Sequence, residues 1–511
     1  METYNIIAIG GTGMRCAESF VHLCAMGMFD DKEINLLALD TDYQNGNFDR
    51  LNSLVNTYTS ITDRASSNTL FSAKINYYSF SPEYHGTDDF DSISRYLTAT
   101  STHDEDDVKW KESDIVDLFL TKEMRDMNLE HGYRAQTQMG SMLMYYAIIE
   151  EAYKAHVGRA KNSRLVKFIE YLMNNPGSKV FLFGSVFGGT GASSIPILPR
   201  AFQKAAQIIA GDGSGDVLSK NIFGTVMLSN YFSFDKPKNQ GDVVAASDKF
   251  ALNSQAALFF YHNDKTIRHT FKRLYLIGRE KPRLVTKGQN EGHTGGKDQR
   301  NPADYIELLA ASAAYDFFTK EHQSETRSGS EGEILFRTLQ SNDDNNLTFN
   351  SFFGEVDGKK FQEKCGIMMA SAFVLGPHNF AGLTFENLNV DSLSLFFRLF
   401  YNLEKEDEEK LGCGWIKQLQ ESVVDDYAGF LFHPDVFSID PSKVKDFSFN
   451  DRLFPDKSDH KFKTSSWKLG SGGSKAYDAF NSKFFEDKNP VTDVANLLER
   501  TYKTFHDLYK F

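Results

Sequence analysis

The sequence predicts an α/β protein built on a parallel sheet with helices on both faces. Short apolar runs of the kind that form buried strands alternate with helix-like stretches from about residue 5 to about residue 320. This alternation is typical of β-α-β units, in which a crossover helix follows each strand. Two of the runs end in glycine-rich turns, at residues 10–13 and 187–193, and a helix-like stretch follows each turn.

The expected elements follow in order along the chain. Strands are expected near residues 5–9, 34–39, 179–184, 222–228 and 273–277. Helices are expected near residues 14–28, 139–160, 192–210, 243–262 and 302–318. The last helix starts with Asn301 as a suitable N-cap and Pro302 at the first helical position. Ligands of parallel sheets bind outside the carboxyl ends of the strands, so the turns after these strands are the expected site.

A net charge of −13 and four scattered cysteines limit the classes of function. The negative charge gives no general attraction to nucleic acid or anionic lipid, and no apolar stretch reaches the roughly 18 residues of a membrane span. The N-terminal residues lack a basic and then apolar leader. The cysteines have no metal-ligand spacing and suit a reducing compartment. We therefore expect a cytoplasmic protein without nucleic-acid partners.

The two glycine-rich turns predict a nucleotide held from both sides. A glycine-rich turn between a strand and a helix directs backbone N–H groups at an anion, at the helix end whose dipole favours negative charge. One such turn is a weak signal, but this chain has two. The expected phosphate contacts are Gly10, Gly11, Thr12 and Gly13 on one side, and Gly188, Gly189, Thr190 and Gly191 on the other.

The order of these turns resembles that of the tubulin and bacterial cell-division tubulin-homologue superfamily, especially its divergent bacterial tubulin-like members. Residues 10–13 are similar to the first phosphate loop, residues 40–42 to the acidic second loop, and residues 132–140 to the loop that wraps the terminal phosphate. Residues 187–193 are similar to the tubulin signature loop, except that Phe187 replaces its first glycine. The resemblance covers about the first 320 residues.

The resemblance implies a tubulin-like nucleotide-binding domain over residues 1–320, with residues 302–318 as its central helix and about residues 45–131 as an insert. It also implies a C-terminal α+β domain, placed at residues 321–455, before a linker and helical tail at residues 456–511. The insert and the tail are the regions expected to bind a protein partner. The acidic run at residues 104–107 of the insert is interpreted as a solvated loop, with a patch that docks a partner as the alternative.

The resemblance further implies nucleotide contacts along all four loops and at the start of the central helix. Beyond the glycines and threonines of the two turns, these are Met14, Arg15, Asp40, Tyr133, Arg134, Ala135, Gln136, Phe187, Ala192, Arg279, Asn301, Asp304 and Tyr305. Asn301, Asp304 or Tyr305 would recognise the base. Arg134 and Arg15 would pair with phosphate. The alternatives are a surface salt bridge for Arg134 and solvent exposure for Arg15.

Asp40 and Asp42 are implied Mg²⁺ ligands, acting through water. Mg²⁺ usually keeps several waters and takes one or two carboxylates together with phosphate oxygens. The alternative is that the run from Asp40 to Asp42 only caps the turn after its strand. Because the two carboxylates follow a strand at the expected edge of the sheet, the ligand interpretation is preferred.

Hydrolysis in the family needs an acidic loop supplied by the next subunit of a filament. Glu355 and Asp357 are the candidates, placed before an apolar run at residues 367–370 that is expected to be a strand. Asp343 and Asp344 are the alternative pair. Either pair is also explained as a solvated turn.

Three hypotheses of function follow. The first is a GTPase that binds GTP or GDP with Mg²⁺ and assembles head to tail into filaments. The second is a nucleotide-binding scaffold or sensor with little or no hydrolysis, for example in phage defence or partitioning. The third, an enzyme that uses a nicotinamide dinucleotide, is disfavoured because the first turn does not form Gly-x-Gly-x-x-Gly.

Overall fold

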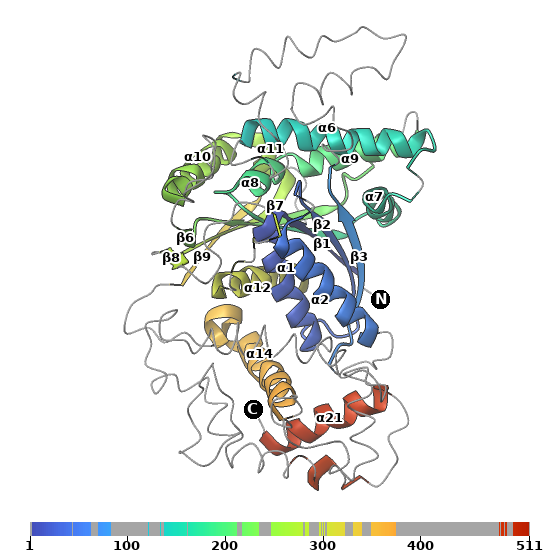
Figure 1. Ribbon diagram of the computed structural model, residues 1–511, viewed down its shortest axis with the longest axis vertical. Helices are drawn as coiled ribbons and strands as arrows, with labels where there is room; N and C mark the ends of the chain where they lie inside the picture. Colours follow the sequence, from blue (N-terminus) through green and yellow to red (C-terminus); the bar gives the residue numbers. More distant parts are fainter. Residues whose placement is uncertain are drawn as a thin grey trace.

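The computed structural model confirms the α/β class. It describes residues 3–42, 44–62, 70–82, 121, 133, 137–160, 162–211, 217–234, 247–279, 282–285, 296–297, 299, 301, 304–321, 331–339, 349–374, 480, 482–484, 486–487 and 494–509. Seven of the described strands form one parallel sheet in the order β3-β2-β1-β4-β5-β7-β9 (Figure 1). They are β1 (Thr3–Ile9), β2 (Glu33–Leu39), β3 (Lys74–Phe80), β4 (Lys179–Ser185), β5 (Ile222–Leu228), β7 (Phe271–Arg279) and β9 (Glu333–Leu339). A smaller pair joins β6 (Phe232–Phe234) to β8 (Arg283–Val285).

Two layers of helices cover the two faces of the sheet (Figure 1). One layer holds α1 (Gly10–Ala25), α2 (Gly46–Thr62) and α12 (Tyr305–Thr319). The other holds α6 (Thr137–His156), α7 (Arg164–Asn174), α8 (Gly189–Ser194), α9 (Leu198–Ala210), α10 (Phe250–Asn263) and α11 (Lys265–Thr270). Side chains alternate between the faces of a strand. Ile6 and Ala8 of β1 therefore join the core with α1 and α12, whereas Ile7 and Ile9 join the core with α6.

Helix α12 confirms the expected central helix and is buried on all sides. Every residue from Tyr305 to Phe318 is buried, because the helix lies between the sheet and α14 (Phe349–Val374). Its N-cap is Asp304, which corrects the expectation of Asn301. Asp304 accepts the N–H of Ile306, and Glu307 accepts the N–H of Asp304 in return. This capping box needs a Glu three residues after the cap, which Asp304 has.

The five expected strands are confirmed as β1, β2, β4, β5 and β7, but two other elements differ from expectation. The expected strand at residues 367–370 is wrong, because these residues belong to α14. Four apolar residues do not reveal their period, and Phe361, Cys365 and Met368 are buried at helical spacing. The helix expected at residues 192–210 is divided into α8 and α9. Pro196 lies in the break, where its missing N–H interrupts the helix.

Strands β3 and β9 extend the sheet beyond the five core strands that were expected. Helix α2 and strand β3 lie inside the expected insert, and β3 pairs with β2 along its whole length. Strand β9 lies past residue 320 and pairs with β7. The expected tail helix is confirmed as α21 (Val494–Tyr509), which packs on α14. Residues 375–479, which include most of the expected second domain and part of the expected linker, lie outside the described residues. None of the described helices is both long and apolar enough to cross a membrane.

Candidate functional site

Three turns that follow strands meet at one edge of the sheet. Because β1 pairs in parallel with both β2 and β4, the residues after these strands leave the sheet on the same side. A Cβ atom added to Gly10 would lie 3.2 Å from the Cβ atom of Thr190. The hydroxyls of Thr41 and Thr190 are 3.3 Å apart. The two glycine turns and the acidic turn at residues 40–42 therefore lie side by side, as their positions after parallel strands predict.

The glycines of these turns meet different needs. Gly10 has a φ of +66°, a left-handed conformation that glycine adopts without steric cost. A Cβ at Gly13 would lie 2.6 Å from the carbonyl oxygen of Phe183, and a Cβ at Gly191 would lie 2.5 Å from that of Ser185. Gly13 and Gly191 thus bring α1 and α8 close to the backbone of β4.

Two asparagines that the sequence analysis did not single out line the first glycine turn. A Cβ on Gly11 would lie 3.0 Å from Nδ2 of Asn47 and 3.1 Å from Nδ2 of Asn45. Asn45 donates to Oδ2 of Asp40 at 3.1 Å, and Asn47 donates to Oδ1 of Asn45 at 3.2 Å. Asn47 is fully buried, and its Oδ1 has no hydrogen-bond partner among the described residues. The sequence signal that could have identified them is the Asn-Gly-Asn run after the acidic turn, because Asn and Gly are typical turn residues.

The carboxylates of the acidic turn accept hydrogen bonds from backbone N–H groups. Oδ1 of Asp40 accepts from Thr41 at 2.8 Å and from Asp42 at 3.3 Å. Both carboxylates are buried, and within the described part of the chain neither forms an ion pair with a Lys or Arg. Burial, and then repulsion by Asp42, raises the pKa of Asp40 from 3.8 to about 7. Asp40 therefore does cap the turn after its strand. Both carboxylates also keep lone pairs that can accept further bonds.

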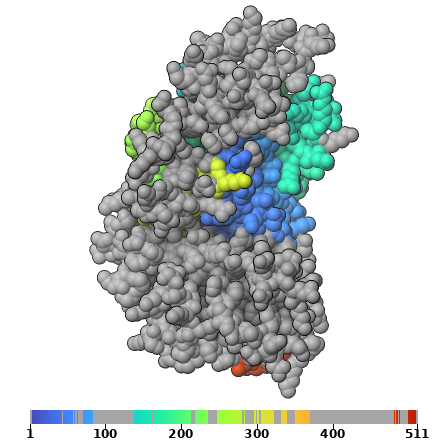
Figure 2. All heavy atoms as spheres, in the orientation of Figure 1, coloured from blue at the N-terminus to red at the C-terminus, as the bar shows by residue number. Residues whose placement is uncertain are grey.

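The acidic turn also contacts a segment that is distant in the sequence. Gly296 donates its N–H to Oδ2 of Asp42 at 2.6 Å, and its carbonyl accepts the N–H of Gly46 at 3.1 Å. Figure 2 shows yellow surface, from the part of the chain near residue 300, against blue surface from the N-terminal part. The segment just before α12 is therefore joined to the acidic turn.

Arg15, an expected phosphate contact, is buried in an ion pair. Its Nε donates to Oε1 of Glu307 at 2.6 Å, and its Nη2 donates to the hydroxyl of Tyr231. That hydroxyl donates to the same Glu307 oxygen at 2.8 Å. Burial acts to lower the pKa of Arg15, but Tyr231 and Glu307 reverse this and leave the pKa above its usual value. The alternative that the sequence left open for Arg15, exposure to solvent, is therefore wrong.

The residues expected on the base side gather at the start of α12. Nη1 of Arg279, at the end of β7, lies 3.2 Å from Oδ2 of Asp304. The guanidinium lies over the ring of Tyr305, 4.9 Å from its centroid. The carbonyl of Asn301 accepts a hydrogen bond from Arg50 of α2 at 3.4 Å. The cation, carboxylate and ring expected to face a base are therefore neighbours.

Other expected contacts are held in the core. Met14 is fully buried on α1. The ring of Phe187 packs against Phe250, with ring centroids 4.8 Å apart. The carbonyl of Ala192 accepts the hydroxyl of Tyr261. Tyr133 is buried against α6, where a side chain at Gly140 would collide with its ring. Arg134, Ala135 and Gln136 lie outside the described residues.

The expected catalytic carboxylates lie on α14. Glu355 is exposed, next to the kink at Gly354. Asp357 is paired within the chain: its carboxylate lies 3.4 Å from Nζ of Lys320 and 3.4 Å from the hydroxyl of Tyr315. The alternative pair, Asp343 and Asp344, lies outside the described residues.

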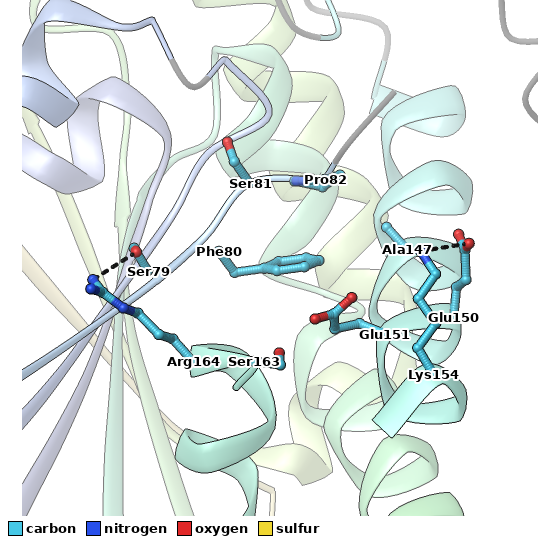
Figure 3. A pocket seen from close by; sticks show the side chains of 10 residues that line it. All are labelled: Ser79, Phe80, Ser81, Pro82, Ala147, Glu150, Glu151, Lys154, Ser163 and Arg164. Carbon is cyan, nitrogen blue, oxygen red and sulfur yellow. Dashed lines mark hydrogen bonds and ion pairs between the residues drawn. The ribbon is translucent and has the colours of Figure 1, made fainter. Parts of the chain in front are cut away.

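A separate pocket of about 190 Å³ opens beyond the carboxyl end of β3 (Figure 3). It is lined by Ser79, Phe80, Ser81, Pro82, Ala147, Glu150, Glu151, Lys154, Ser163 and Arg164. Figure 3 shows Lys154 against Glu150, an ion pair of 2.9 Å, across from Arg164. The pocket adjoins the acidic turn, because Ser81 donates to the carbonyl of Asp40 at 2.6 Å. Small-molecule pockets usually measure roughly 300–1,000 Å³, so this pocket is too small for a nucleotide.

The residues at the edge fit phosphates and one Mg²⁺ ion better than an all-protein metal centre. Within the described part of the chain, no three His, Cys, Asp or Glu side chains gather closely enough to hold a metal. Mg²⁺ in nucleotide sites needs only one or two carboxylates, because phosphate oxygens and water complete its coordination. Asp40 and Asp42 supply that number, beside the glycine turns and the Asn47 oxygen that has no partner among the described residues.

Comparison with known proteins leaves the family open. No protein-family model and no curated protein matches the chain. Among solved structures, the chain is similar to TubZ of Clostridium botulinum phage c-st, in a form with a truncated C-terminal tail, at 11% identity and a TM-score of 0.25. The match covers 65% of this chain and 66% of the TubZ chain, just under two thirds of its length. Similarity at this level assigns no family, so the geometry of the site carries the functional argument.

Proposed function

We propose that the chain is a tubulin-like GTP-binding protein whose nucleotide lies where the glycine turns meet. One observation carries the proposal: Gly10 of the first turn lies against Thr190 of the second, a Cβ at Gly10 being 3.2 Å from that of Thr190. The turns approach each other at the edge where parallel sheets bind ligands. Backbone N–H groups on both sides would neutralise phosphate charge without long flexible side chains.

Each part of the edge has a role in this proposal. Residues 10–13 and 188–191 hold the phosphates, with the Thr190 hydroxyl as an added donor. Asp40 and Asp42 hold Mg²⁺ through water, and the ion neutralises phosphate charge when bound. Asp304 and Tyr305, positioned by Arg279, face the base.

Self-assembly completes the proposal. Subunits would stack head to tail in the cytoplasm, a heterologous contact that gives open filaments. The nucleotide of one subunit would then face carboxylates of the next. Glu355 is exposed on α14 and is therefore available to a neighbour, whereas Asp343 and Asp344 are the alternative pair. A carboxylate from the neighbour would orient the attacking water.

Binding, turnover and assembly test the proposal in one series. We expect calorimetry to show that the protein binds GTP with Mg²⁺ more tightly than NAD. Phosphate release per molecule should rise steeply with protein concentration, and GTP should increase the pelleted fraction. Thr190→Ala should weaken GTP binding. Thr270→Ala, which removes a hydroxyl that donates to the Thr266 carbonyl within α11 at 2.8 Å, should leave GTP binding unchanged. Equal affinities of the two variants would contradict the site.

A second candidate function is a nucleotide-binding scaffold or sensor with little or no hydrolysis. It is favoured by Asp357, whose carboxylate is already paired with Lys320 and Tyr315 within the chain. Under this proposal GTP binds, and phosphate release stays at background at every protein concentration. Glu355→Ala combined with Asp357→Ala separates the candidates, because it abolishes turnover only in the GTPase. A catalytic carboxylate of this kind contributes about 10²–10⁴-fold to the rate.

A further inference from the structure

The Arg15 cluster, defined as Arg15, Tyr231 and Glu307, connects elements that lie far apart in the sequence. Arg15 lies in the second turn of α1, two residues after Gly13, and Glu307 lies in the first turn of α12. Helices α1 and α12 pack side by side on one face of the sheet (Figure 1). Arg15, Tyr231 and Glu307 are each 1% exposed, so no water competes for their hydrogen bonds.

We infer that Arg15 is a positioning residue that sets the distance between the first glycine turn and the start of α12. The inference rests on the proposed function, which assigns these two elements to the phosphate side and the base side of one site. Arg15 is then not a phosphate ligand. Its guanidinium would have to leave a buried carboxylate 2.6 Å away before it could reach a phosphate, and would leave that carboxylate unpaired.

Glu307 carries the connection to the base side. Its Oε1 accepts from Arg15, while its Oε2 accepts the N–H of Asp304 at 3.1 Å. Asp304 in turn pairs with Arg279 at 3.2 Å, and Arg279 lies over the ring of Tyr305. A shift of Arg15 therefore changes the cap of α12 and the groups that face the base. Networks of buried hydrogen bonds couple their members in this way.

A double-mutant cycle on nucleotide binding tests the inference. The variants are Arg15→Met, Glu307→Leu and the two together, with GTP and ATP affinities measured by calorimetry on folded protein. We expect each single variant to bind GTP about tenfold more weakly, and the double variant to lose about tenfold as well, since both changes break one connection. The ratio of GTP to ATP affinity should move away from the wild-type value in all three.

Two further variants separate positioning from stability. Tyr231→Phe removes only a hydroxyl, so it keeps the fold and should still move the affinity ratio. Arg273→Met is the matched control, because Arg273 is a fully buried Arg that pairs with Asp316 at 3.5 Å near the other end of α12. It should destabilise the protein and leave the affinity ratio of the folded fraction at the wild-type value.

Other results would overturn the inference. If Arg15 bound phosphate directly, the double variant would lose about a hundredfold, the product of two independent losses, and the GTP to ATP ratio would not move. An unmoved ratio in Tyr231→Phe and in the double variant would reduce the cluster to a structural contact. A wild type that binds neither nucleotide would overturn the proposed function itself, and this inference with it.

Discussion

Two buried charged clusters flank the first glycine turn, and they differ in how their charge is balanced. In the Arg15 cluster, a guanidinium and a carboxylate lie 2.6 Å apart and share a tyrosine hydroxyl. In the acidic turn, Asp40 and Asp42 are buried with N–H groups and one amide as their hydrogen-bond donors. The first cluster combines opposite charges, whereas the second combines like charges.

Under the proposed function, this difference distinguishes a structural ion pair from a site that binds an external cation. A buried ion pair with its hydrogen bonds made requires nothing further from a ligand. Burial, and then the like charge of Asp42, favours a proton on Asp40 and raises its pKa to about 7. An external cation would supply the missing charge. Under the proposed function, the acidic turn would therefore be stabilised by Mg²⁺, whereas the Arg15 cluster would not.

Removing one charged partner from the Arg15 cluster should cause the largest loss of stability. Glu307→Leu leaves a buried guanidinium without its carboxylate, and the free energy of unfolding should fall by about 3–5 kcal/mol. Adding Arg15→Met should recover most of this loss, because an apolar pair replaces an ion pair. Urea unfolding of the single and double variants measures both. A double variant less stable than either single variant would show that the cluster is not self-contained.

Removing the charge of Asp40 should change the pH dependence of the free energy of unfolding. The expected change is slightly smaller than the loss in Glu307→Leu. The pKa of Asp40 is about 7 in the folded protein against 3.8 when unperturbed, so the folded state binds the proton more tightly. Wild-type stability should therefore fall as the pH rises from about 4 to about 7 and then level off, a contribution of at most about 4 kcal/mol. Asp40→Asn should lack this fall in unfolding measured without nucleotide.

His22 provides the internal check on that experiment. Burial, and then the charge of Arg50, lowers the pKa of His22 to about 3, so its contribution rises with pH over the range from about 3 to 6.5. The rise is present in both proteins and cancels in the difference between them. Parallel stability curves for wild type and Asp40→Asn would mean that Asp40 does not titrate as a buried carboxyl.

Within the first glycine turn, Gly13 and Gly11 should show the same contrast between structural support and ligand binding. The expected loss of stability is intermediate in size. Gly13→Ala places a methyl group 2.6 Å from the Phe183 carbonyl oxygen and should cost about 1–3 kcal/mol of stability. Gly11→Ala meets the side-chain amides of Asn47 and Asn45, at 3.0 and 3.1 Å, and should cost less stability but weaken nucleotide binding. Unfolding and calorimetry of both variants give the comparison. Equal losses of stability and of nucleotide affinity in the two variants would contradict the different roles of the two glycines.

The smallest effect is expected from Asp42→Asn. This change replaces a charged acceptor for the N–H of Gly296, a bond of 2.6 Å, with a neutral one. Charge-assisted bonds are about twice as strong as neutral ones, so the loss should be about 1 kcal/mol. Faster hydrogen exchange at the Gly296 amide would report it. Exchange at Gly46, whose N–H bonds to the Gly296 carbonyl, should rise with it if the contact opens as a unit.

The strands of the core and both glycine turns could be predicted because their signals are local. An apolar run such as residues 5–9 is complete within one strand, and a glycine turn after it is a property of neighbouring residues. The edge on which the turns meet also followed, since parallel strands end on the same side. The helical state of residues 367–370 could not be predicted, because the burial of α14 against α12 and α21 decides it.

By itself, the sequence determined the α/β class, the order of the strand-end turns and the residue types at the site. Only the tertiary structure decided which of those residues pair with each other. Arg15 and Glu307 are 292 residues apart, and Asp42 and Gly296 are 254 apart, so no local pattern links them. Burial then sets their chemistry. Arg15 is buried against the carboxylate of Glu307, whereas Asp40 is buried beside a second acid, Asp42. Both residues lie close to the first glycine turn, at the same edge of the sheet.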